Sequence, residues 1–431
     1  MFRKILLLIA LIIFPAAASA SVADEIASDP NRSGGIYYAY PVEADSCPAP
    51  PEGFSPVYIS HYGRHGSRWA IKEWKYGVVL DEFARQRERG NLTPEGERVE
   101  AMVKALWADA ECNAGALTPM GERQHKAIAG RMAARFPALF TDSARVRVFS
   151  SVEPRCIVSM AAFCERLKEL NPALRIDRTV SPGNMDFIAF STPEAKAAGS
   201  DTAVWRPHFN HWRDSVVNSR RLMKQLFRHP REIKAPNRLM TLIHDIAIAE
   251  QNTTLRTGIM DIFTPAELFA LWRVLNYEMY VKHACAPVTA QAGPHSARSL
   301  LRHIVAEADT ALLGYNSYLS YNSYNSPSVT LRFGHDTNLI RLLALMGVEG
   351  CDKAESDPDR YHLAWQDFRV SPMGANLQLI FYRNSAGRTL VLLRHNERPV
   401  RLTSLPTIAQ DSYFYDWQLL RQYFRSLLSD N

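Results

Sequence analysis

The feature that most constrains the fold is a recurring order of apolar strand, polar turn and helix. A strand at residues 57–60 runs directly into a turn rich in glycine, arginine and histidine. A second strand at 146–149 ends in two serines and precedes helical spacing over 154–170, and a third strand at 329–333 ends in Gly-His-Asp. Because strands that alternate with helices pack into layers, we predict an α/β fold with a central sheet flanked by helices.

Helices and a hairpin extend this pattern. Helical spacing covers 94–110 and 118–136, and the second helix begins at a Thr-Pro pair, which suits a cap followed by a first-turn proline. Alternating residues at 377–382 and 389–394 flank an Asn-Ser-Ala-Gly turn and predict a late hairpin. Residues 21–56 are rich in Pro, Ser and Ala and predict an irregular lead-in.

The chain is long enough for two packed units. Its 431 residues exceed the roughly 250 to 300 at which single cores stop growing. From 184 to 326 the pattern changes to long helical segments such as 265–283 and 297–312, without convincing strands. We therefore predict a core domain of residues 21–183 plus 327–431, and an inserted, mostly α-helical domain of residues 184–326.

The first twenty residues have the pattern of an export signal. Two basic residues precede an apolar run at 5–14, and the small-residue sequence Ala18-Ser19-Ala20 follows. The apolar run is too short to span a bilayer, which needs roughly twenty residues. We predict a signal peptide of residues 1–20, cleavage after Ala20, a periplasmic or secreted product, and no membrane attachment after cleavage.

Charge and cysteine content narrow the choice of partners. The formal net charge is +6, without a long Lys/Arg block, which suits a polyanionic small molecule and gives no indication of nucleic-acid binding. An even number of cysteines in an exported chain predicts at least one disulfide, whose pairing stays open. The six are Cys47, Cys112, Cys156, Cys164, Cys285 and Cys351.

Polar clusters follow three of the predicted strands. Their residues are Arg64, His65 and Arg68, then Arg155, and then His335 with Asp336. Ligands of open α/β sheets bind at the carboxyl ends of strands, so we expect these side chains to converge. Guanidinium groups bind phosphate oxygens in pairs, an imidazole can attack phosphorus, and a nearby acid can protonate the departing oxygen. The clusters together predict phosphoryl chemistry.

These motifs resemble those of a known family. The turn 64–68, Arg-His-Gly-Ser-Arg, and residues 334–339, Gly-His-Asp-Thr-Asn-Leu, resemble the paired signature of the histidine acid phosphatases, which belong to branch 2 of the histidine phosphatase superfamily and include phytases. Residues 117–123 resemble the family's Leu-Thr-x-x-Gly helix start, 150–163 its segment with a third phosphate-binding arginine, and 371–377 its late strand. The resemblance implies a phosphoglycerate-mutase-like fold with a mixed sheet.

The resemblance also implies roles for individual residues. His65 would be the nucleophile that forms phosphohistidine, and Asp336 would protonate the leaving alcohol. The residues that would hold the phosphoryl oxygens are Arg64, Arg68, Arg155 and His335. No metal or other cofactor is implied. In detail the segments are most similar to the multiple inositol polyphosphate phosphatases, although these usually carry His-Ala-Glu where this chain has His335-Asp336-Thr337.

We therefore expect an exported acid phosphatase that acts on small phosphorylated molecules, with inositol polyphosphates such as phytate as the leading substrates. A broad-specificity or sugar-phosphate phosphatase is the alternative, and a non-catalytic phosphate-binding module with the same fold is a third reading.

Lys72 and Lys75 are weaker candidates for contacts at the rim of the pocket, since a solvated charged surface explains them equally well. An acidic pH optimum is expected because Asp336 donates only when protonated. The oligomeric state stays open.

Overall fold

The computed structural model describes most of the chain. The described residues are 20–40, 47–188, 192–193, 196–197, 202–289, 292–316 and 326–429. Apart from Ala20, the predicted signal peptide lies outside them. In these ranges, no helix combines the length and apolar character that crossing a membrane requires.

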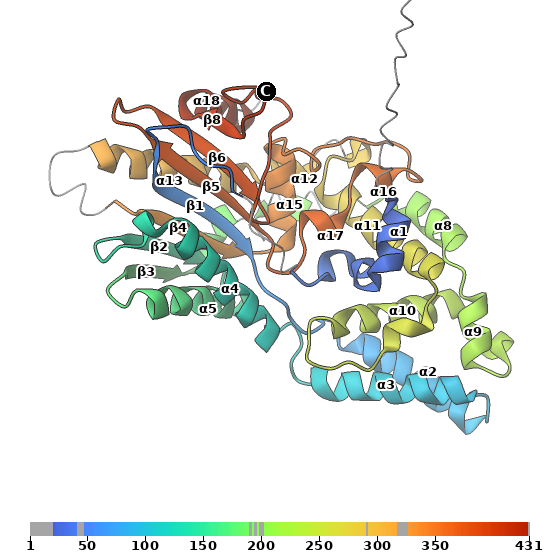
Figure 1. Ribbon diagram of the computed structural model, residues 1–431. Helices are drawn as coiled ribbons and strands as arrows, with labels where there is room; N and C mark the ends of the chain where they lie inside the picture. The colour runs from blue at the N-terminus through green and yellow to red at the C-terminus, as the bar shows by residue number, and fades with distance from the viewer. Residues whose placement is uncertain are drawn as a thin grey trace, which may run out of the picture.

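A single mixed sheet organises the fold (Figure 1). Its strands run in the order β3-β2-β4-β1-β5-β6-β7, with β8 paired to β6. The strands are β1 (Ser55–Arg64), β2 (Arg145–Ser150), β3 (Arg175–Val180), β4 (Val329–Gly334), β5 (Asn376–Arg383), β6 (Thr389–His395), β7 (Arg398–Pro399) and β8 (Phe414–Asp416). The first four pair in parallel and the later ones antiparallel, which confirms the predicted mixed sheet.

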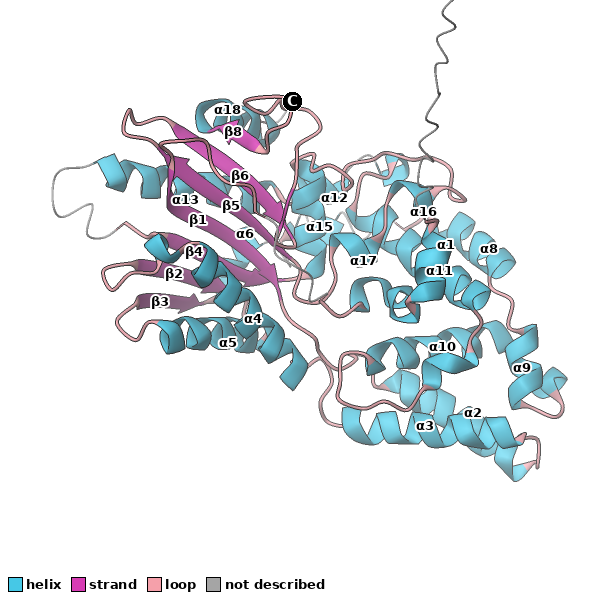
Figure 2. Cartoon of the chain, viewed as in Figure 1, coloured by secondary structure: helices cyan, strands magenta, loops and turns pink. Residues whose placement is uncertain are grey.

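Helices cover both faces of the sheet (Figure 2). Helices α4 (Pro119–Arg135) and α5 (Pro154–Leu170) lie on one face, and α13 (Arg298–Asn316), α15 (Asp336–Leu345) and α18 (Trp417–Leu428) lie on the other. Successive residues of the central strands point to opposite faces, so each strand contributes to both apolar layers. Strands β1 and β4 are largely buried, whereas β2 buries alternate residues.

Most of the remaining helices lie together beside the sheet (Figure 2). They are α2 (Trp74–Glu88), α3 (Pro94–Ala110), α8 (Arg206–Val216), α9 (Arg220–Leu226), α10 (Pro236–Glu250), α11 (Pro265–His283), α12 (Ala292–His295), α16 (Tyr361–Ala364) and α17 (Asp367–Val370). Helix α6 (Met185–Ile188) instead packs against α13 and β4. Helices α2 and α3 pack against α9 and α10, although they precede the segment expected to form the helical domain. The boundaries of that domain stay a prediction.

Two elements differ from the expectations. The lead-in is not wholly irregular, since it contains α1 (Val22–Ser28) and the 3₁₀ helix η1 (Pro30–Tyr37). A capping box starts α1, in which Ser21 and Asp24 each accept a hydrogen bond from the other's backbone N–H. Strand β3 was not predicted because it is an edge strand with mostly exposed residues and therefore lacks an apolar pattern.

The expected disulfide is absent, and all six cysteines are free thiols. Cys156 and Cys164 share helix α5, and a separation of eight residues corresponds to about 12 Å along a helix. A disulfide needs Cα atoms within roughly 7 Å, so this pair cannot form one. Cys112 is exposed, whereas Cys285 and Cys351 are buried.

A close backbone contact seats the turn after β1 on the first turn of α4. A Cβ atom added to Gly66 would lie 2.5 Å from the carbonyl oxygen of Gly121, and one added to Gly121 would overlap the carbonyl oxygen of Ser67. The side chain of Thr118 caps α4 and also donates a hydrogen bond to the carbonyl of Ser67 (3.1 Å). The two motifs that were recognised separately in the sequence are thus one packing unit.

Replacing Gly121 tests this contact. We expect Gly121→Ala to lower the free energy of unfolding by about 1 to 3 kcal/mol, because the added methyl group overpacks the contact. The control is Gly130→Ala in the same helix, where the added Cβ would lie 3.5 Å from the Arg166 side chain. There the better helix propensity of alanine should raise stability by up to about 1 kcal/mol. Urea denaturation of both variants measures the difference, and equal effects would contradict the contact.

Candidate active site

Pairing between neighbouring strands brings the three predicted clusters together. Strands β1 and β4 are adjacent and parallel, with Arg64 opposite Gly334, and β2 lies on the other side of β4 with Ser150 opposite Phe333. The turns that follow these strands therefore leave the sheet at the same edge. This is the carboxyl edge, where ligands of α/β sheets bind.

His65 is buried and oriented by the backbone of its own turn. Its Nδ1 lies 2.9 Å from the carbonyl oxygen of Gly66, which can only accept, so Nδ1 carries the proton and Nε2 carries the lone pair. Among the described residues, Nε2 has no hydrogen-bond partner. Burial, with help from the cations Arg64 and Arg68, holds the pKa of His65 well below its ordinary value. The imidazole is therefore neutral and nucleophilic even in acid.

The three predicted arginines share one arrangement. Each uses Nη1 to bind a protein acceptor: Arg64 the carbonyls of Ile36 (2.5 Å) and Ser371 (2.7 Å), Arg68 that of Trp69 (3.0 Å), and Arg155 the carboxylate of Glu153 (2.9 Å). In each, Nε is buried without a hydrogen-bond partner among the described residues.

Buried donors without partners are rare because leaving them unsatisfied is costly. A guanidinium fixed through Nη1 presents Nε and Nη2 as a pair, the geometry that binds two oxygens of a phosphate. The three arginines, which we call the cradle, therefore fit a phosphoryl group.

Asp336 lies within the cradle. Its Oδ2 is 3.0 Å from Nη2 of Arg64, and its side chain is 14% exposed. Burial alone would raise the pKa of Asp336, but the guanidinium groups of Arg64 and Arg68 outweigh it and hold that pKa at about 2. The carboxyl is therefore ionised in the empty site.

His335 connects the third turn to the second. Its Nδ1 accepts from Nη2 of Arg155 (3.4 Å), since arginine only donates, and its Nε2 lies 3.2 Å from Oγ of Ser151. Its ring centroid is 5.9 Å from that of His65. Burial, followed by the charge of Arg155, lowers the pKa of His335 to about 3, so this imidazole is also neutral in the empty site.

The rim candidates have different surroundings. Nζ of Lys75 forms an ion pair with Asp245 (2.5 Å), whereas Lys72 is exposed. The charge of Lys75 helps to lower the pKa of Tyr37, after the larger effect of Arg68, so Lys75 lies within electrostatic reach of the cradle. A role for either lysine in binding substrate stays a prediction.

Sequence reasoning missed the neighbours that hold the cradle. Ile36 and Tyr37 come from the lead-in, and the ring of Tyr37 lies 4.9 Å below the guanidinium of Arg68. No local pattern marks them, because their role depends on how the lead-in crosses the sheet edge. Glu153 had a signal, since it stands two residues before Arg155.

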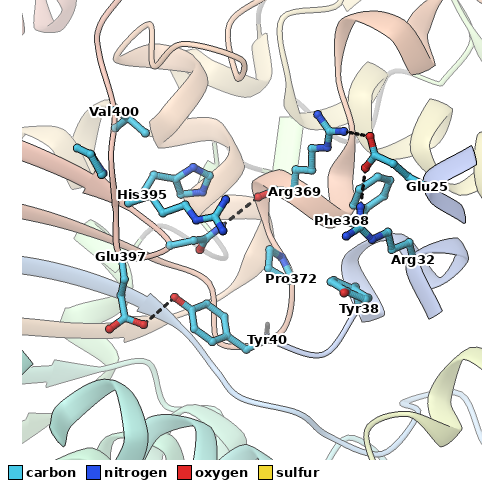
Figure 3. Close-up of a pocket in the computed structure, with 13 residues that line it drawn as sticks. Glu25, Arg32, Tyr38, Tyr40, Phe368, Arg369, Pro372, His395, Glu397 and Val400 are labelled. Atoms are coloured by element: carbon cyan, nitrogen blue, oxygen red, sulfur yellow. Dashed lines mark hydrogen bonds and ion pairs between the residues drawn. The ribbon is translucent and has the colours of Figure 1, made fainter. Parts of the chain in front are cut away.

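A separate pocket is lined by none of the cradle arginines (Figure 3). Its volume is about 490 Å³, and its wall includes Pro372, which follows the Ser371 that binds Arg64. Its acidic residues are already paired: Glu25 with Arg32 and Arg369, and Glu397 with Tyr40 and Arg131. This pocket therefore offers no unsatisfied charge to a ligand.

The described residues hold no group of three or more His, Cys, Asp or Glu side chains placed to bind a metal ion. His61, four residues before His65, instead lies in an apolar layer with its ring 5.5 Å from Phe163 and 5.7 Å from Phe333. Burial lowers the pKa of His61 to about 3. It packs as a neutral core residue.

Similar proteins have related folds. The multiple inositol polyphosphate phosphatase of Bifidobacterium longum, solved in complex with phosphate, superposes with a TM-score of 0.71 over 92% of this chain and 98% of that one, at 16% identity. A phytase from D. castellii gives a TM-score of 0.65 over 93% of this chain and 86% of that one, at 15% identity. Multiple inositol polyphosphate phosphatase 1 of Gallus gallus is 26% identical over 368 residues, covering 81% of this chain and 78% of that protein.

The mixed sheet carries, at its carboxyl edge, three arginines and a buried, neutral histidine. The model of the histidine phosphatase superfamily (branch 2) matches residues 63–403. The chain belongs to this superfamily, which confirms the resemblance seen in the sequence. It is a phosphoric monoester hydrolase that acts on a small phosphorylated molecule.

Proposed function

We propose that this chain is an exported phosphatase that removes phosphate from inositol polyphosphates through a phosphohistidine on His65. The observation that carries the proposal is the set of buried Nε donors on Arg64, Arg68 and Arg155. The charges of Arg64 and Arg68 act on His65, and Arg155 contacts His335, whose ring lies 5.9 Å from that of His65. Names of relatives with the same fold, two of them multiple inositol polyphosphate phosphatases and one a phytase, support the substrate class. The pattern of residues 1–20 supports export.

The first step transfers the phosphoryl group to the enzyme. Nε2 of His65 attacks phosphorus, and the bond from phosphorus to the ester oxygen breaks. The cradle donors neutralise the charge on the phosphoryl oxygens as it is transferred. Asp336 gives its proton to the leaving oxygen, which departs as an alcohol.

The second step releases phosphate. Water attacks the phosphohistidine, the carboxylate of Asp336 accepts a proton from that water, and the bond from phosphorus to Nε2 breaks. The products are inorganic phosphate, neutral His65 and protonated Asp336. Asp336 loses this proton again once phosphate has left, since its pKa is about 2.

The proton needed by Asp336 can enter with the substrate. With a pKa of about 2, Asp336 is ionised in the empty site at pH 4 to 6. A phosphate monoester is a monoanion below its second pKa, near 6. A monoanionic ester beside an ionised Asp336 carries one transferable proton, and a dianionic ester beside a protonated Asp336 carries the same proton. The negative phosphoryl group beside Asp336 favours moving that proton to the carboxyl.

His65→Ala tests the nucleophile and the substrate class together. We expect wild type to release phosphate from inositol hexakisphosphate with a higher kcat/KM than from glucose 1-phosphate, and the variant to lose at least about a thousandfold on both. Phosphate release is the measurement. Equal rates on the two substrates would favour a broad-specificity phosphatase. Substrate binding without any release by wild type would favour a non-catalytic module.

Asp336→Asn tests the proton donor. An alkoxide leaving group needs a proton, so turnover of an inositol phosphate should fall by about 10² to 10⁴. p-Nitrophenolate is a stable anion, and turnover of p-nitrophenyl phosphate should fall far less. Comparing the two substrates removes any effect of the charge change on Arg64, because both substrates use the same cradle. An equal loss on both would exclude Asp336 as the donor.

The pH profile follows from the same proton. For an inositol phosphate we expect kcat/KM to fall by about tenfold per pH unit above the second pKa of the ester, near 6, because the required proton is then absent. Because the pKa of His65 is held well below its ordinary value, protonation of His65 limits the rate only at a lower pH than it would for an ordinary histidine. A rate that rises steadily to pH 8 would contradict the assignment.

A further inference from the structure

The cradle contains a carboxylate that the proposed chemistry does not use. Glu153 precedes helix α5, and its Oε2 lies 2.9 Å from Nη1 of Arg155. Its side chain is 35% exposed, so it lies at the open side of the site, whereas the side chain of Arg155 is only 12% exposed. Glu153 makes no side-chain hydrogen bond that caps α5, so helix formation does not explain its position.

The three nitrogens of the Arg155 guanidinium have different surroundings. Nη1 is occupied by Glu153, Nη2 faces Nδ1 of His335, and Nε is buried without a partner among the described residues. A phosphate held by Nε and Nη2 would therefore lie opposite Glu153 on the same guanidinium. Its negative charge would be within a few ångströms of the carboxylate, separated by the planar group that binds both.

Charge balance shows what the carboxylate does. Arg64 already has Asp336 as its counter-ion, and Arg68 contacts the neutral groups Trp69 O and Tyr37. With Glu153 ionised as well, three guanidinium groups face two carboxylates. Without Glu153, the cradle would have one more uncompensated positive charge and would attract a dianion more strongly.

We propose that Glu153 is a counter-charge that limits how tightly the cradle holds a phosphate dianion. It weakens the binding of every phosphoryl group through Arg155, the product included. In a reaction whose last step frees inorganic phosphate from the same donors that bound the ester, such weakening favours product release. The inference rests on the proposed function for this consequence, but the effect on phosphate affinity does not depend on turnover.

Glu153→Gln tests the inference, because glutamine keeps the size of the side chain and removes its charge. Inorganic phosphate is the probe, and isothermal titration calorimetry on the purified full chain gives its Kd without any turnover. We expect the variant to bind phosphate about twofold to fivefold more tightly than wild type, the range that a partly exposed charge contact supports. The gap should narrow between 0.15 M and 1 M salt, since screening weakens only an electrostatic effect.

The control is Glu165→Gln, which removes the same kind of charge from helix α5, the helix that Glu153 precedes. Glu165 is 61% exposed and pairs with Lys126, away from the cradle, so its Kd for phosphate should match that of wild type. Weaker binding in Glu153→Gln would mean that Glu153 positions Arg155, and unchanged binding would mean that it has no influence. Either result overturns the inference. Absence of phosphatase activity in wild type would instead overturn the proposed function, while the comparison of Kd values would still decide the role of Glu153.

Discussion

The ion pair between Arg64 and Asp336 is the contact on which the rest of the site depends. Arg64 is fully buried, and a buried guanidinium without a counter-ion is strongly destabilising. Asp336 supplies the counter-charge at 3.0 Å, while the carbonyls of Ile36 and Ser371 occupy Nη1. The pair also joins the turn after β1 to the turn after β4. The interaction that allows the cation to be buried therefore also fixes the two turns that carry the imidazoles.

The guanidinium groups of the cradle also influence the protonation states of Asp336, His65 and His335. Burial and positive charge act in the same direction on His65 and His335, because both disfavour a charged imidazole. On Asp336 they act in opposite directions, and the guanidinium groups prevail. His65 is consequently neutral and Asp336 ionised. In the proposed mechanism, phosphoryl transfer therefore depends on a substrate that brings negative charge and a proton together.

The strands and motifs that could be predicted are those with a pattern in a short stretch of sequence. Strands β1 and β4 are largely buried and β2 buries alternate residues, so all three have a strand pattern in the sequence. The turns that end them hold the cradle arginines and both histidines. Strand β3 was missed because an exposed edge strand has no such pattern. The expected disulfide is absent because an even number of cysteines carries no information about the distances between them. Cys156 and Cys164, for example, lie on the same helix and are too far apart to pair.

The parts that sequence did not reveal are those whose role exists only after folding. Ile36 and Tyr37 precede the residues that match the superfamily model, yet they contact two of the three cradle arginines. Asn252, at the end of α10, holds the carbonyl of Tyr37 and the hydroxyl of Ser67 at once, so it joins the lead-in to the Arg-His-Gly turn. The reacting groups are thus set by short motifs, whereas their surroundings are set by segments far apart in the chain. Differences in substrate preference between proteins that share the motifs should therefore arise from these surroundings.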